Sequence, residues 1–194
     1  HDLTLLVPAV HLLTLHPALY LGRSIPSALG IYFKQTQTYK VLQMGAPNLY
    51  QWIANSFYDV VLPIGVGVAF AVAIIVLAAM ARSSRDADIA FWVSASLGFL
   101  LLLPALLPAM HERYFYAADV FSVIYAFCFP RRAAVAVAVI LASVTAYVPY
   151  LFGRPAPLKL AAVALIACTA FVIYTAWRDG SRYGAVAPAG PGQT

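Results

Sequence analysis

Residues able to do chemistry gather in one short segment, residues 110–119, which reads MHERYFYAAD. His111, Glu112 and Arg113 stand together there between two strongly apolar runs. Ionisable side chains in such a place are typical of a substrate, ion or proton site. The alternative is an ordinary solvated turn, with tyrosines such as Tyr114 forming an aromatic belt at the membrane surface.

Asp119 favours the functional interpretation of this segment. It lies several residues inside an apolar run, where a carboxylate costs about 2.5–3.5 kcal/mol on insertion scales. If the segment is helical, Glu112, Tyr116 and Asp119 fall at i, i+4 and i+7 and share one face, which continues to Ser122. A structural alternative is that Arg113 or His111 simply neutralises the aspartate.

A second candidate stretch is the connection 22–58, which is too long for a simple turn between helices. Its apolar positions approximate one helical face, which favours a helix lying along the membrane surface. The face comprises Leu29, Tyr32, Phe33, Thr36, Tyr39 and Leu42. The segment 46–52, APNLYQW, then predicts a turn before the next apolar run. Its candidate loop contacts are Asn48, Tyr50, Gln51 and Trp52, although Tyr50 and Trp52 are equally compatible with aromatic residues that mark the headgroup level.

The amino-acid composition indicates what kind of secondary structure positions these residues. Of 194 residues, 63% are hydrophobic and 10% are charged, and the mean hydropathy is +0.83. A soluble domain carries about 25% charged residues. The apolar runs are about 20 residues long, enough for a helix to cross a bilayer, and lipid leaves the backbone few other ways to satisfy its hydrogen bonds.

The sequence therefore predicts an all-α, polytopic bundle of transmembrane helices with about six spans and a long outer loop. The predicted spans are 3–21, 59–81, 89–110, 115–129, 133–152 and 158–177. The fourth is short, at about 15 residues. We expect residues 1–178 to form the transmembrane domain and residues 179–194, rich in Gly, Pro and Ala, to form a disordered cytoplasmic tail.

Basic residues near the span ends predict the orientation. Three breaks fall on one face, which we expect to be cytoplasmic, and their arginines are Arg82, Arg85, Arg131, Arg132, Arg178 and Arg182. The opposite face holds as many basic residues, but half of them are spread through the long connection. The segments 22–58 and 111–114 are then expected outside.

Metal and nucleic-acid binding have little support. Cys128 and Cys168 both fall in predicted spans, which leaves no zinc motif of closely spaced cysteines. His11 and His16 point about 140° apart on a helix, so they would not share a metal. The net charge of +5 gives no separate indication of a nucleic-acid partner.

The element MHERYFYAAD, preceded some sixty residues earlier by APNLYQW, resembles bacterial membrane mannosyltransferases related to the GPI-anchor mannosyltransferases, of the GT-C superfamily. Its His-Glu-Arg is also similar to the His-Glu-Lys of lipid-phosphate-dependent glucosyltransferases of the endoplasmic reticulum. The likeness covers roughly residues 20–130. It implies a hexosyltransferase in the bacterial inner (plasma) membrane, with no certain cofactor, which moves a sugar from a polyprenyl-phosphate donor to an acceptor on the outer face.

The same likeness implies roles for the cluster. Arg113 would bind the lipid phosphate bidentately and His111 would add a donor. Glu112 would orient Arg113 or bind a sugar hydroxyl, and Asp119 would hold the cluster together from below. In such enzymes the catalytic acid lies in a first outer loop, and this chain has no such loop. We therefore expect a C-terminal part that works with a remaining N-terminal part and is inactive alone.

Two other classes stay open. A lipid or small-solute transporter would use the same cluster as a substrate or proton site. However, the sequence has neither matching interrupted helices nor an internal repeat. A purely structural membrane subunit would leave Asp119 unexplained.

Overall fold

The computed structural model describes residues 10, 13, 15–29, 40–83 and 88–183. The chain forms two compact units, His1–Lys40 and Val41–Thr194. In the first unit, residues 15–20 are helical and a short helix, α2, spans Ile25–Leu29. Most of the first predicted span, 3–21, and most of the face predicted for an interfacial helix lie outside the described residues.

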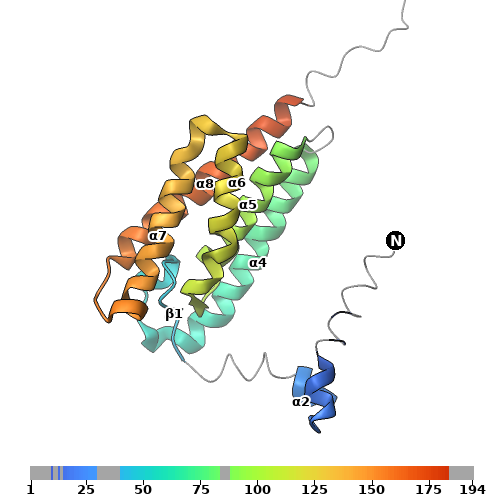
Figure 1. Cartoon of the computed structure of the whole chain (residues 1–194), viewed down its shortest axis with the longest axis vertical. Coiled ribbons are helices and arrows are strands. Elements are labelled where there is room, and N and C mark those ends of the chain that lie inside the picture. The colour runs from blue at the N-terminus through green and yellow to red at the C-terminus, as the bar shows by residue number, and fades with distance from the viewer. Residues whose placement is uncertain (1–9, 11–12, 14, 30–39, 84–87, 184–194) are drawn as a thin grey trace, which may run out of the picture. The chain divides into compact units, whose positions relative to one another are not determined.

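The described residues of the second unit form five α-helices. Figure 1 shows them running side by side. They are α4 (Tyr58–Ser83), α5 (Ile89–Leu106), α6 (Tyr116–Cys128), α7 (Ala133–Phe152) and α8 (Leu158–Tyr183). Among the described residues, four helices are long and apolar enough to cross a membrane, and α6, with 13 residues, is shorter. The predicted fold class, an all-α bundle of transmembrane helices, is confirmed.

Helix α8 is central to the packing. It contacts α4, α5 and α7, while α6 packs against α5 and α7. Leu97 and Leu101 of α5 meet Leu165 and Val172 of α8 in the core. At Gly98 a Cβ would lie 3.1 Å from Cγ1 of Ile173, so a small residue is needed where these helices approach closely.

Helix α5 ends at Leu106, four residues before its predicted end. The cause is Pro108, because the residue before a proline is disfavoured in the helical region. Leu107 is accordingly extended, with ψ 133°, and Ala109 takes a positive φ of 58°. The chain therefore turns sharply before it reaches the polar cluster.

The segment after this turn pairs with the long connection that precedes α4. Strand β1 (Gln43–Met44) runs parallel to strand β2 (Met110–His111), with Met44 opposite His111. Two 3-10 turns, η1 (Leu49–Trp52) and η2 (Asn55–Phe57), lead into α4, and a third, η3 (Glu112–Phe115), leads into α6. These short elements bring together the two segments that the sequence analysis had singled out.

The opposite end of the bundle holds the basic breaks. There α4 and α8 end, α5 begins, and the turn η4 (Pro130–Arg132) joins α6 to α7 (Figure 1). Arg132 Nη2 lies 2.7 Å from Asp179 Oδ2, and its guanidinium stacks 4.7 Å from the centre of the Phe129 ring. Helix α8 continues four residues past this ion pair, through Tyr183. Residues 179–183 are thus helical, not part of the predicted disordered tail, and residues 184–194 lie outside the described chain.

Candidate functional site

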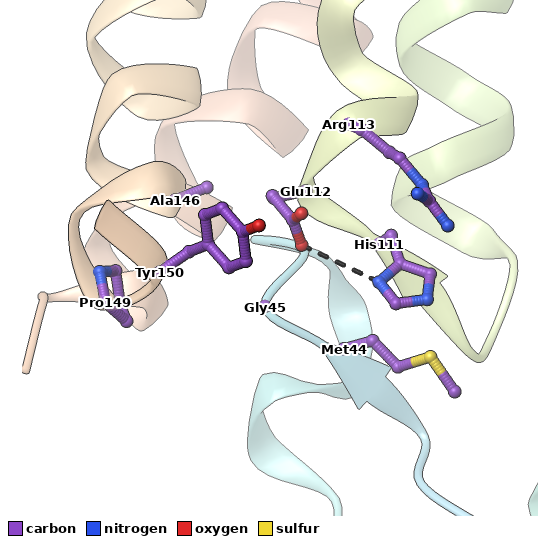
Figure 2. A pocket seen from close by; sticks show the side chains of 8 residues that line it. All are labelled: Met44, Gly45, His111, Glu112, Arg113, Ala146, Pro149 and Tyr150. Atoms are coloured by element: carbon purple, nitrogen blue, oxygen red, sulfur yellow. Dashed lines mark ion pairs between the residues drawn. The ribbon is translucent and has the colours of Figure 1, made fainter. Parts of the chain in front are cut away.

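A cavity opens at the end of the bundle where β1 and β2 lie (Figure 2). Its volume is about 480 Å³, within the range of small-molecule sites. Three parts of the chain form it: the β1 strand and the glycine after it, the start of the segment after β2, and the last turns of α7. Its lining residues are Met44, Gly45, His111, Glu112, Arg113, Ala146, Pro149 and Tyr150.

Glu112 is held close against the backbone of the β1 segment. At Gly45 a Cβ would lie 3.2 Å from the Glu112 Oε2, and φ there is +80°, a conformation that glycine adopts without strain. His111 contributes the other constraint, with Nδ1 3.7 Å from the same oxygen. The carboxylate is therefore positioned by strand pairing and by a glycine.

Arg113 stands apart from this pair. Its side chain is exposed, and no other residue in the described part of the chain forms a hydrogen bond or ion pair with it. In the described chain Glu112 forms no ion pair with Arg113 and lies beside His111. Its two expected roles, orienting Arg113 or binding a sugar hydroxyl, stay predictions. The guanidinium keeps its five donors available at the cavity wall.

Asp119 sits one turn further along, in the first turn of α6. Its Oδ2 accepts a hydrogen bond of 2.7 Å from the hydroxyl of Ser143 on α7. Its Oδ1 is buried with no hydrogen-bond partner among the described residues. The structural alternative, in which His111 or Arg113 neutralises Asp119, has no ion pair to support it among the described residues, where a hydroxyl from another helix is the donor. Asp119 does not line the cavity.

Tyr116 departs from the predicted shared face. The 3-10 turn η3 changes the rotation per residue before α6 begins, so the i, i+4, i+7 relation does not hold across it. Tyr116 is 69% exposed, whereas the buried stripe runs through Phe115, Ala118 and Ser122. Tyr116 does not line the cavity.

The loop residues predicted as contacts do not line the cavity. Two of them bind the end of α5 instead. Buried Asn48 donates to the Leu107 carbonyl at 3.3 Å, and the Tyr50 hydroxyl donates to the Leu106 carbonyl at 2.8 Å. These are carbonyls at the C-terminus of α5 that no further helical turn can satisfy. Burial raises the pKa of Tyr50, which keeps its phenol protonated and donating.

Gln51 and Trp52 complete the loop. The amide of Gln51 donates to the Ala46 carbonyl at 2.7 Å and to Oε1 of Gln43 at 3.1 Å. Trp52 is about half exposed. Like Asn48 and Tyr50, neither lines the cavity.

Sequence reasoning missed the wall of the cavity that α7 supplies. Ala146, Pro149 and Tyr150 come from a uniformly apolar run that gives no sign of facing a polar cluster. It also missed Gly45, because two-residue strands leave no periodic pattern.

Comparison with known proteins gives no further assignment: no family model, curated protein or solved structure matches the chain. Among the residues that the structure describes, no three His, Cys, Asp or Glu side chains gather as a metal site would require. The cavity offers one guanidinium, one imidazole, one carboxylate and one phenol.

Proposed function

We propose that this chain is part of a GT-C type membrane glycosyltransferase, mannosyltransferase-like, and that the cavity binds the phosphate of a polyprenyl-phosphate sugar donor at the outer face of a bacterial inner membrane. The lipid tail would stay in the hydrocarbon beside the bundle. The phosphate would then lie at the headgroup level, one turn outside α6.

The exposed guanidinium of Arg113 at the wall of the cavity carries this proposal. Within the described chain no other residue forms a hydrogen bond or ion pair with it, so a ligand phosphate need not displace an acidic partner. Arginine donates two parallel hydrogen bonds to phosphate oxygens, a geometry that lysine lacks. His111, which also lines the cavity, can add an imidazole N–H donor.

The test is donor binding by the 194-residue chain in lipid nanodiscs, with labelled polyprenyl phosphate and polyprenyl-phosphate mannose. Arg113→Ala should weaken both ligands by roughly one to two decades, the loss expected for one charge-assisted contact of about 1.5–3 kcal/mol. Arg113→Lys should recover part of that loss. The same variants in the full-length protein should lower sugar transfer at limiting donor, with substrate supplied directly on the outer side.

Arg131→Ala is the matched control, since Arg131 is exposed at the opposite end of the bundle. It should bind both ligands as the wild type does. If Arg113→Ala binds and transfers as well as wild type across a range of donor concentrations, the phosphate site is wrong. Net movement of an intact solute, without sugar transfer, would favour a transporter instead.

A further inference from the structure

Tyr150 is the aromatic side chain in the cavity that the phosphate site does not explain. It lies in the last turn of α7 and is 79% exposed, yet it lines the same cavity as Glu112. In Figure 2 its ring lies on one side of the Glu112 carboxylate, and His111 and Arg113 lie on the other. Phe152, two residues later and also largely exposed, does not line the cavity.

An aromatic ring facing a fixed carboxylate matches an amphipathic ring-shaped ligand. A pyranose presents a patch of C–H groups on its face and hydroxyl donors around its rim. The tyrosine ring supplies apolar contact at low cost in conformational entropy, and an ionised carboxylate accepts hydrogen bonds from hydroxyls. A phosphate alone would use neither group.

The order of the groups also suits a sugar next to a phosphate. Glu112 and Arg113 both line the cavity, so one ligand that reaches both would carry an anionic part for Arg113 and a hydroxyl part for Glu112. Glu112 lies close to Gly45, where an added Cβ would come within 3.2 Å of its Oε2, and that oxygen is 3.7 Å from His111 Nδ1. Among the described residues, His111 is the only one within ion-pair distance of this carboxylate, which leaves it capacity for a ligand.

We propose that Tyr150 and Glu112 form a sugar subsite of this cavity, with a hexose ring packed on Tyr150 and its hydroxyls donating to Glu112. This inference rests on the proposed function, because Arg113 and the lipid phosphate place the sugar there. It assigns selectivity for the sugar to α7. It also separates two contributions, anchoring by Arg113 and recognition by Tyr150.

The experiment compares bare polyprenyl phosphate with three polyprenyl-phosphate sugars, which differ from one another only in the sugar. Equilibrium binding of polyprenyl phosphate and of polyprenyl-phosphate mannose, glucose and galactose is measured on the 194-residue chain in nanodiscs. The wild type should bind at least one sugar-bearing ligand more tightly than the bare phosphate. Tyr150→Leu should reduce that advantage roughly 3- to 10-fold, the range for one lost aromatic contact, and leave the bare phosphate within about twofold.

Companion variants keep the result interpretable. Tyr150→Trp should retain most of the advantage and Glu112→Ala should lose it. Phe152→Leu, which removes an exposed aromatic residue from the same helix end, should change neither ligand. Unchanged elution in size-exclusion chromatography shows that each variant is folded.

The binding measurements distinguish a failure of the sugar subsite from a failure of the phosphate site. If the bare phosphate binds and depends on Arg113, but Tyr150→Leu alters neither ligand or weakens all ligands equally, the sugar subsite is wrong and the phosphate site stands. A wild type with no preference for any sugar also overturns the subsite. If the wild type binds neither class of ligand, or Arg113→Ala changes nothing, both proposals fall.

Discussion

At the residue scale, Asp119 is a buried carboxylate whose hydrogen bonding is incomplete. Its Oδ1 is buried without a described partner, and one serine hydroxyl on α7 serves its Oδ2. Its place in the first turn of α6 stabilises the carboxylate, because a negative charge there interacts favourably with the N-terminal end of the helix dipole. Ser143, itself 2% exposed, therefore matters more than an average polar contact between helices.

We predict that Ser143→Ala lowers stability by about 1–3 kcal/mol, the cost of a buried acceptor that loses its partner. Adding Asp119→Ala should restore part of the loss, because the unpaired group is then removed as well. A double-mutant cycle on unfolding midpoints in mild detergent measures this coupling. Thr145→Val is the control, since the Thr145 hydroxyl is exposed and bonds only within its own helix, to Leu141. Strictly additive effects of the two substitutions would contradict the prediction.

The identity of these polar residues was predictable from sequence, but their partners were not. The apolar sequence around Asp119 already indicated that its charge needs a hydrogen-bond or ion-pair partner. The sequence offered His111 and Arg113 as neighbours, whereas the structure supplies Ser143, 24 residues away on another helix. Contacts of this kind depend on how α6 and α7 rotate against each other, and the largely apolar α7 carries little periodic signal for that rotation.

At the element scale, the short pieces around the cavity depend on the loop before α4. Asn48 is fully buried and serves two backbone groups at once. Its Oδ1 accepts from the Tyr50 amide at 3.1 Å, and its Nδ2 donates to the Leu107 carbonyl. It thereby ties η1 to the end of α5, next to the β1–β2 pair.

Substituting Asn48 should therefore loosen the whole loop. We predict that Asn48→Ala costs about 1–3 kcal/mol of stability. Asn48→Asp should also destabilise, because the carboxylate still accepts from Tyr50 but faces the Leu107 carbonyl without a donor. Hydrogen exchange followed by mass spectrometry should show faster exchange in residues 42–53 and 107–112, with α8 unchanged. If exchange rises evenly over the bundle, the loop is not a separate structural unit.

The bounds of some of these elements were predictable from the sequence, and those of others were not. The ranges of α7 and of the start of α8 follow from apolar runs and from the breaks at Arg131 and Pro157. The early end of α5 follows from Pro108, a signal that was present but outweighed by the length of the apolar run. The β1–β2 pairing joins segments more than sixty residues apart through two residues each, too few for any periodicity to appear.

At the scale of the whole molecule, charged side chains gather at both ends of the bundle. One end carries the cavity with its imidazole, carboxylate and guanidinium, while the other carries the basic breaks and the Arg132–Asp179 ion pair. In Figure 1 the described C-terminal ends of α4 and α8 and the connection between α6 and α7 lie at that second end. Which end faces the cytoplasm remains a prediction from the positive-inside rule.

Cysteine labelling in intact cells decides the orientation. In a background with Cys128 and Cys168 replaced by serine or alanine, single cysteines are placed at Arg131 and Tyr114, which are exposed at opposite ends of the bundle. Because basic residues in short turns are retained in the cytoplasm, an impermeant thiol reagent should label position 114 and spare position 131. Permeabilised cells, in which both positions must react, control for accessibility. Labelling at 131 alone would put the cavity on the cytoplasmic side and remove the outer-face donor site with it.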